Sequence, residues 1–436
     1  MTPEMIGLYG GVLLLVLLAI RAPIGVALGL SGVAGLFALR GVTATFSAVG
    51  SITYDFIANW ELTSVPMFLL MGAVVYHSGL ATSLFRAARA WLSFLPGGLA
   101  ISTNLASAGF AAASGSSVAM TGAMARLAIP EMLRAGYEKG LAAGSVASAG
   151  TLGALIPPSI PFIIYGVFVQ ESIGKLLLAG LLPGLLTMFC YSVLILVRVK
   201  LKPELAPRTH DQVEMKEKLR LLARAWPIPV MVLGVVGGLY SGSVTATETG
   251  AFGAGVAIIA SIADRSFSWR MFRNSILETL RMTSAIFLIA MGAVIFTRFL
   301  TLSHVTVLIG TLVSDYSLSL PVFLVFVSIF FLILGMFLDP VGLMLISLPI
   351  LQPITSRLGV DMIWFGVIMV KYIEIGLLTP PIGLNLFVTS AALGREFPFE
   401  RIVKGTAWFL CAEAVVMILI MSFPQISLFI PGLSGP

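Results

Sequence analysis

Long apolar runs recur along the whole of this 436-residue sequence, and they constrain its fold more than any other feature. A run of about 17 or more apolar residues is long enough to cross a lipid bilayer as an α-helix. The chain is 58% apolar and only 11% charged, which leaves too little polar surface to cover a water-soluble protein of this length. We therefore expect an all-α, polytopic membrane protein with about ten spans and two shorter re-entrant pairs.

Lys and Arg residues predict the orientation of these spans. Eight of the 26 lie between residues 198 and 224, and the excess of positive charge in cytoplasmic loops places this stretch inside. Alternating the direction of the spans on either side of this stretch places most of the other Lys and Arg residues inside too. It also places both termini on the periplasmic side. The net charge of +6 thus indicates topology and not a nucleic-acid partner. Residues 4–20 lack the features of a cleaved signal peptide and are expected to remain as the first span.

Several unusual strings occur twice, about 220 residues apart. Residues 68–75 read FLLMGAVV and residues 287–295 read FLIAMGAVI; GALIPPSIPFII begins at Gly153, and GLLTPPIGLNLF begins at Gly376. This predicts two repeats, 1–200 and 226–436, joined by a cytoplasmic linker, 201–225. The stretch 41–63 contains no Lys or Arg, whereas its counterpart 264–281 carries four Arg. The repeats should therefore have inverted topology, which often underlies alternating access; a duplication retained only for packing is the alternative.

Each predicted repeat contains a re-entrant helical hairpin and a broken helix. The hairpins are expected at about 98–130 and about 319–355, and the broken helices at about 138–168 and about 362–391. Each broken helix is interrupted by a Pro-Pro pair. Proline has no N–H to donate and clashes with the preceding turn, so nearby carbonyl oxygens lose their helical partners.

These interruptions predict a binding site for a cation and an acid. Free carbonyl oxygens can ligate a small hard cation, and the N-termini of half-helices favour a carboxylate. The predicted sodium ligands are Ser114, Gly115, Ser117, Gly153, Ile156, Ser159, Gly335, Asp339, Gly376, Thr379 and Ile382. The predicted substrate-binding residues are Ser116, Pro340 and Asn385. The alternative is that the small residues only allow helices to pack closely.

The other polar residues in the apolar segments give weaker evidence for a functional site. Lys371 and Glu374 lie one helical turn apart within a span, and we expect them to neutralise each other, either as a structural pair or in proton or substrate movement. Cys190 and Cys411 are isolated, and the three His have no companions at ligand spacing. We therefore expect no metal other than Na⁺ and no cofactor. An intramembrane enzyme would need a catalytic constellation that we do not find.

Taken together, six motifs resemble the large membrane subunit of TRAP (tripartite ATP-independent periplasmic) transporters, the DctM-like family. They are RAPIGVALGLSG from Arg21, SGSSVA from Ser114, GTLGALIPPSIPFIIYG from Gly150, GGLYSGSVTATETGAFGA from Gly237, FLDP from Phe337 and EIGLLTPPIGLNLFV from Glu374. The sequence departs from the family pattern at Ala246, where many relatives have Pro, and at Met120, where Asp is common. The second departure puts a carboxylate role at that position in doubt.

The resemblance implies an elevator-type carrier in the bacterial inner membrane that uses Na⁺ to import a carboxylate-bearing organic acid. It also implies two partners: a periplasmic substrate-binding protein and a small membrane subunit of about four helices. No additional N-terminal helices precede the first span, so we expect the small subunit to be a separate chain. A stand-alone dicarboxylate or ion carrier of related architecture is the alternative. No nucleotide-binding phosphate loop is found in the sequence, in agreement with transport that does not use ATP.

Overall fold

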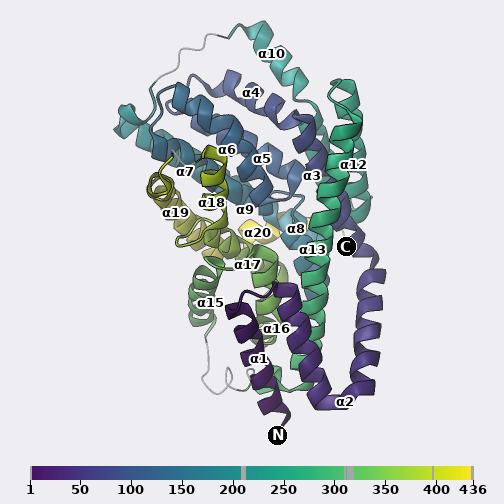
Figure 1. The fold of residues 1–436 in the computed structure, drawn as a ribbon. Coiled ribbons are helices and arrows are strands. Elements are labelled where there is room, and N and C mark those ends of the chain that lie inside the picture. Colours follow the sequence, from purple (N-terminus) through teal and green to yellow (C-terminus); the bar gives the residue numbers. More distant parts are fainter. Residues whose placement is uncertain (1, 208–212, 309–310, 312–318, 395–396, 434–436) are drawn as a thin grey trace.

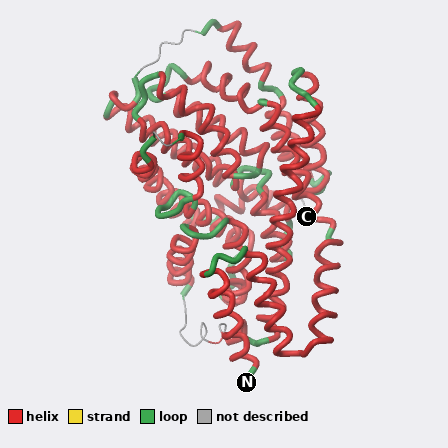
Figure 2. Tube along the Cα trace, in the orientation of Figure 1, coloured by secondary structure: helices red, strands yellow, loops and turns green. Residues whose placement is uncertain are grey.

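The computed structural model describes residues 2–207, 213–308, 311, 319–394 and 397–433. This part of the chain consists of helices joined by short loops and contains no strand (Figures 1 and 2). The predicted all-α fold is therefore confirmed for the described residues.

One group of helices forms a long, narrow framework along one side of the molecule (Figure 1). Its members are α1 (Pro3–Ala19), α2 (Ile24–Ala58), α3 (Ser64–Ser78), α11 (Pro227–Ser241), α12 (Ala246–Ala263) and α13 (Trp269–Leu302). The helix α2 is kinked at Gly41, where φ is 75°, and its second part forms an arm. Small residues bring these helices together: a Cβ added at Gly292 would lie 2.3 Å from the carbonyl oxygen of Gly25. Such close approach is typical of helix packing in membranes.

The second group contains the two hairpins and the two broken helices. The hairpins are α5 (Gly98–Ser114) with α6 (Ser117–Arg134), and α15 (Leu320–Gly335) with α16 (Pro340–Arg357). The broken helices are α7 (Lys139–Ala149) with η2 (Gly150–Ala154) and α8 (Ile160–Val169), and α17 (Met362–Gly376) with α18 (Leu384–Leu393). Figure 1 shows the first hairpin toward one end of the molecule and the second toward the other, with α17 between them.

The remaining described helices surround or connect these two groups. They are η1 (Trp60–Thr63), α4 (Leu80–Leu92), α9 (Ile173–Leu201), η3 (Pro203–Leu205), α10 (Met215–Arg224), α19 (Phe399–Ser422) and α20 (Gln425–Leu433). The predicted linker 201–225 contains η3 and α10, and its residues 208–212 lie outside the described part.

The packing between the two halves is reciprocal. In the framework, α3 packs against α12 while α2 packs against α13. Among the hairpins and broken helices, α6 packs against α18 while α8 packs against α16. Likewise α7 packs against α19 while α17 packs against α9. Each contact thus has a counterpart in which the two halves exchange roles.

Five described helices are long and apolar enough to cross a membrane: Ile24–Ala58, Ile173–Leu201, Ala246–Ala263, Trp269–Leu302 and Phe399–Ser422. Two bent helix pairs pass the same test together, Trp60–Ser78 with Leu80–Leu92 and Met215–Arg224 with Pro227–Ser241, which raises the number to seven. The expected number of about ten spans is larger. It differs because shorter apolar helices, such as α1 and α15, fall below the length required of a single uninterrupted span.

Candidate functional site

The first candidate site lies where the tip of the first hairpin contacts the first broken helix. The tip turns at Gly115, whose φ of 60° favours glycine. A Cβ added there would lie 2.8 Å from the carbonyl oxygen of Pro158. Ser116 is the N-cap of α6, and its hydroxyl accepts the N–H of Ala119 at 3.4 Å. The hydroxyls of the flanking Ser114 and Ser117 are buried and have no hydrogen-bond partner among the described residues.

The first broken helix meets this tip with its interrupted backbone. A Cβ added at Gly153 would lie 2.8 Å from the Cα and N atoms of Ser117, so the two backbones are in direct contact. After the Pro157-Pro158 pair, Ser159 is the N-cap of α8 and accepts the N–H of Phe162 at 3.4 Å. The hydroxyl of Ser159 donates to the carbonyl of Ala154. Its predicted role as a cation ligand therefore falls to its backbone carbonyl oxygen.

The second candidate site repeats this arrangement in the other half. A Cβ added at Gly376 would lie 2.6 Å from the Cα of Gly335, so the second hairpin contacts the second broken helix through two glycines. Asp339 is the N-cap of α16 and accepts the N–H of Gly342 at 2.9 Å, with Pro340 at the first helical position. One carboxylate oxygen of Asp339 is therefore occupied by helix capping. Thr379 donates its hydroxyl to the carbonyl of Ile375 at 2.7 Å, which leaves its lone pairs available.

The predicted site residues fall into these two groups, with one exception. Asn385 belongs to the second half, yet a Cβ added at Gly150 would lie 2.6 Å from its Nδ2 atom, so it faces the first broken helix. Asn385 is 0% exposed, and neither of its amide atoms has a hydrogen-bond partner in the part of the chain that the structure describes. The groups also differ in exposure: Ile156 is 4% exposed, whereas its counterpart Ile382 is 38% exposed. The first site is closed and the second is open at its edge.

A buried polar cluster lies beside the first site, and the sequence analysis did not predict it. The expected pairing of Lys371 with Glu374 is wrong, because the Nζ of Lys371 lies 2.5 Å from the Oε2 of Glu413 on α19. Lys371 also donates to Thr187 at 2.9 Å. The other carboxylate oxygen of Glu413 accepts the hydroxyl of Tyr191. A sequence signal did exist, since Glu413 is an isolated carboxylate within an apolar stretch, but its partner lies on another helix.

This cluster is completed by a residue of the first broken helix. Thr151, in η2, donates to Glu413 at 3.3 Å. The cluster therefore joins α9, α17 and α19 to the interrupted segment, and it fixes the position of η2 relative to the second half.

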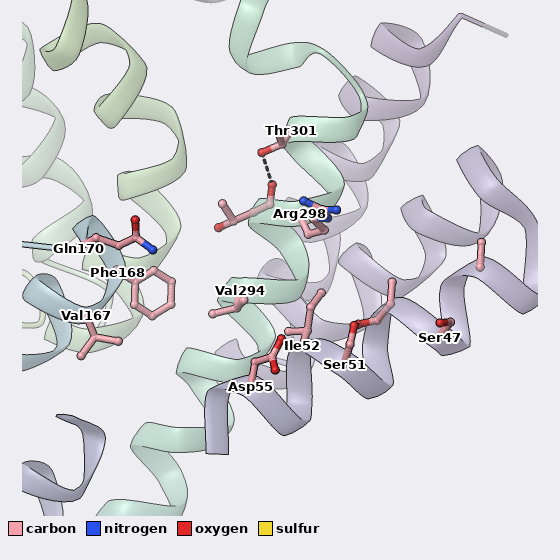
Figure 3. A pocket seen from close by; sticks show the side chains of 13 residues that line it. Ser47, Ser51, Ile52, Asp55, Val167, Phe168, Gln170, Val294, Arg298 and Thr301 are labelled. Atoms are coloured by element: carbon pink, nitrogen blue, oxygen red, sulfur yellow. Dashed lines mark hydrogen bonds between the residues drawn. The ribbon is translucent and has the colours of Figure 1, made fainter. Parts of the chain in front are cut away.

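Two cavities border the framework helices. The larger, of about 780 Å³, is lined by the arm of α2, the end of α8 and α13 (Figure 3). Polar side chains from all three elements line it, including Asp55, Gln170 and Arg298. The volume is that of a small-molecule site.

The second cavity, of about 610 Å³, is lined by basic residues of α13, Arg273 and Arg281, and by the pair His77 and Glu278. The Nε2 of His77 lies 2.7 Å from the Oε2 of Glu278. Glu278 also borders a small gap beside Ser114 and Ser116. The basic cavity therefore adjoins the tip of the first hairpin.

Comparison with known proteins identifies the family. The sequence profile of the family described as "Tripartite ATP-independent periplasmic transporter, DctM component" matches residues 12–426. The C4-dicarboxylate TRAP transporter large permease protein DctM of Pseudomonas aeruginosa is 39% identical over 385 residues, covering 86% of this chain and 87% of that protein. The sialic acid TRAP transporter large permease protein SiaM of Vibrio cholerae is 30% identical, covering 86% of this chain and 87% of that protein.

A third relative, the isethionate TRAP transporter permease protein DctMQ of Oleidesulfovibrio alaskensis, is 32% identical, covering 95% of this chain and 65% of that protein. Among solved structures, the Alcanivorax borkumensis YdaH transporter superposes with a TM-score of 0.60 over the whole of both chains at 14% identity. That likeness shows the fold alone.

These relatives are permease subunits of transporters and not enzymes. Membership of the family implies a bacterial inner-membrane location and partnership with a small membrane subunit and a periplasmic binding protein. With a profile match over nearly its whole length, this chain belongs to the DctM family of large membrane subunits of TRAP transporters.

Proposed function

We propose that this chain is the translocating subunit of a Na⁺-coupled secondary transporter that imports a carboxylate-bearing organic acid. The observation that carries the proposal is the paired contact of hairpin tips with broken helices, Ser117 on Gly153 and Gly335 on Gly376. Non-helical backbone within a membrane is tolerated only where it is buried in protein or lines a wet cavity. Backbone oxygens freed at two such points provide suitable ligands for Na⁺.

The charge balance of transport favours a coupling cation. One Na⁺ moving down a membrane potential of 100 mV releases about 2.3 kcal/mol, so two or more ions offset an anionic substrate and still drive its accumulation. The unpartnered hydroxyls of Ser114 and Ser117 and the amide of Asn385 provide further polar contacts for an ion or a carboxylate.

The substrate class is supported by the relatives. Their names specify C4-dicarboxylates and sialic acid, which carry carboxylates, and isethionate, which carries a sulfonate; all three are organic anions. The basic cavity at Arg273 and Arg281, adjoining the first hairpin tip, suits an anion that enters or leaves this tip.

Movement of the hairpins and broken helices relative to the framework is the proposed transport step. The larger cavity lies at this boundary and favours such an elevator motion, because the boundary is less tightly packed there than a protein core. We further propose that both termini are periplasmic and that the small membrane subunit is a separate chain.

Uptake into proteoliposomes tests this function. The complex with its small subunit would be reconstituted, the binding protein added outside, and labelled organic acids tested one by one. We expect uptake to require both the binding protein and an inward Na⁺ gradient, and to proceed without ATP. Equal uptake when K⁺ replaces Na⁺ on both sides would refute Na⁺ coupling.

A further inference from the structure

Glu374 is a buried carboxylate that the helix packing leaves without a full set of partners. It lies on α17, is 1% exposed, and its Oε2 atom has no hydrogen-bond partner among the described residues. The nearby ammonium of Lys371 is already paired with Glu413, and both of these residues are 0% exposed. Two buried carboxylates thus share one buried cation.

This excess of buried negative charge destabilises the folded state. An uncompensated charge in a low-dielectric interior is strongly destabilising unless a counter-charge, several hydrogen bonds or a bound proton accompanies it. Tyr191 and Thr151 direct their hydroxyls to Glu413 and not to Glu374. The described part of the chain therefore offers Glu374 the shared attraction of Lys371 and the neighbouring side chain of Ser117, but no charged partner of its own.

The carboxylate faces the first hairpin tip. The side chain of Ser117 lies beside the carboxyl of Glu374, yet the Oγ of Ser117 is itself buried without a hydrogen-bond partner. One helical turn further along α6, Thr121 and the unpartnered amide of Asn385 both lie against Gly150. Carboxylate, hydroxyl and amide oxygens are the ligands that hard cations prefer.

We infer that Glu374 is a ligand of the sodium ion at the first hairpin and links the two cation sites. This inference rests on the proposed function and deepens it. Glu374 belongs to the second half but reaches Ser117 in the first, and two residues after it Gly376 contacts Gly335 at the second hairpin tip. A sodium ion beside Glu374 supplies the missing positive charge. Because both contacts are made by one short segment of α17, occupancy of one site is expected to influence the other.

Thermal unfolding of the purified complex tests the inference without transport. Unfolding would be followed in NaCl titrations, with choline chloride holding ionic strength constant. In wild type we expect Na⁺ to raise Tm, because a ligand that binds only the folded state stabilises it. In Glu374→Gln we expect the Na⁺ concentration for half-maximal stabilisation to rise about tenfold or more, since a charged ligand is lost. Without Na⁺ this variant should be at least as stable as wild type, because the unbalanced charge is gone.

Two further variants complete the test. Ser117→Ala, which removes one neutral ligand, should weaken the response to Na⁺ with little change in Tm without Na⁺. Glu400→Gln is the matched control: Glu400 lies 2.6 Å from Lys404 and its side chain is 74% exposed, so its response to Na⁺ should equal that of wild type.

The outcomes separate this inference from the proposed function. If wild type and Glu374→Gln respond equally to Na⁺, Glu374 is not a ligand, while Na⁺ coupling through the other residues stands. If Glu374→Gln is less stable than wild type in choline chloride, the carboxylate has a structural role and the inference fails. If Na⁺ does not stabilise wild type, both the inference and the Na⁺ coupling fail.

Discussion

The contact between Gly335 and Gly376 is the point where one added methyl group should have the clearest effect. In Gly376→Ala the new Cβ would lie 2.6 Å from the Cα of Gly335 and 2.9 Å from its carbonyl oxygen. Both atoms belong to the backbone, so no side-chain rotation relieves the clash and α15 must move away from α17. Overpacking of this kind costs about 1–3 kcal/mol. Better helix propensity returns about 0.5–1 kcal/mol of this, so the net effect is destabilising.

A matched substitution separates the clash from the helix effect. Gly255 lies within α12, and nothing is within 4 Å of a Cβ added there, so Gly255→Ala should leave Tm unchanged or raise it. Tm of both variants would be measured on the purified complex, and Na⁺-driven uptake in proteoliposomes. We expect Gly376→Ala to lower both Tm and uptake. A Gly376→Ala variant as stable and active as Gly255→Ala would refute the close contact of hairpin and broken helix.

Three other substitutions test separate parts of the account. Thr379→Ala should weaken the Na⁺ dependence of uptake while the protein still inserts normally; unchanged Na⁺ activation in proteoliposomes would exclude Thr379 as a ligand. Glu413→Gln removes the carboxylate in direct contact with Lys371 and leaves only the neighbouring Glu374 as a counter-charge, so it should destabilise the chain by less than the roughly 3–5 kcal/mol of a fully unpaired buried charge; an unaltered Tm would argue against the pair. His77→Ala breaks a partly exposed contact with Glu278 and should change stability by no more than about 1 kcal/mol. A larger loss of Tm would show that this contact is structural.

The features that could be predicted well are those specified locally by residues that interrupt or turn a helix, such as proline and glycine. Pro157-Pro158 and Pro380-Pro381 cannot continue a helix, and each lies at the interruption between two helices in the structure. Gly115 marks the first hairpin turn because its positive φ suits glycine. Such signals lie within a few residues of the structure they determine. The Pro-Pro signal occurs in both halves, whereas the positive-φ glycine does not, because Gly335 is the last residue of α15.

Features that depend on which helices become neighbours were not predictable in this way. Lys371 and Glu374 have the spacing of a helical pair, but α19 brings Glu413 closer, and no local pattern in the sequence specifies that packing. The position of Asn385 against the first broken helix, and not within its own half, has the same origin. Comparing the two repeats also could not predict that Ile382 is more exposed than Ile156, because equivalent residues need not be equally covered by neighbouring helices.

We propose that a sodium ion and an acid are held where hairpin tips meet interrupted helices from two oppositely oriented halves. Electron cryo-microscopy of the complex in a bilayer, with Na⁺ and then with choline in its place, would test this arrangement. We expect Na⁺-dependent density between Ser117 and Gly153 and between Gly335 and Gly376. Maps in which Pro157 and Pro380 lie in continuous lipid-facing helices, or in which neither contact holds an ion, would contradict it.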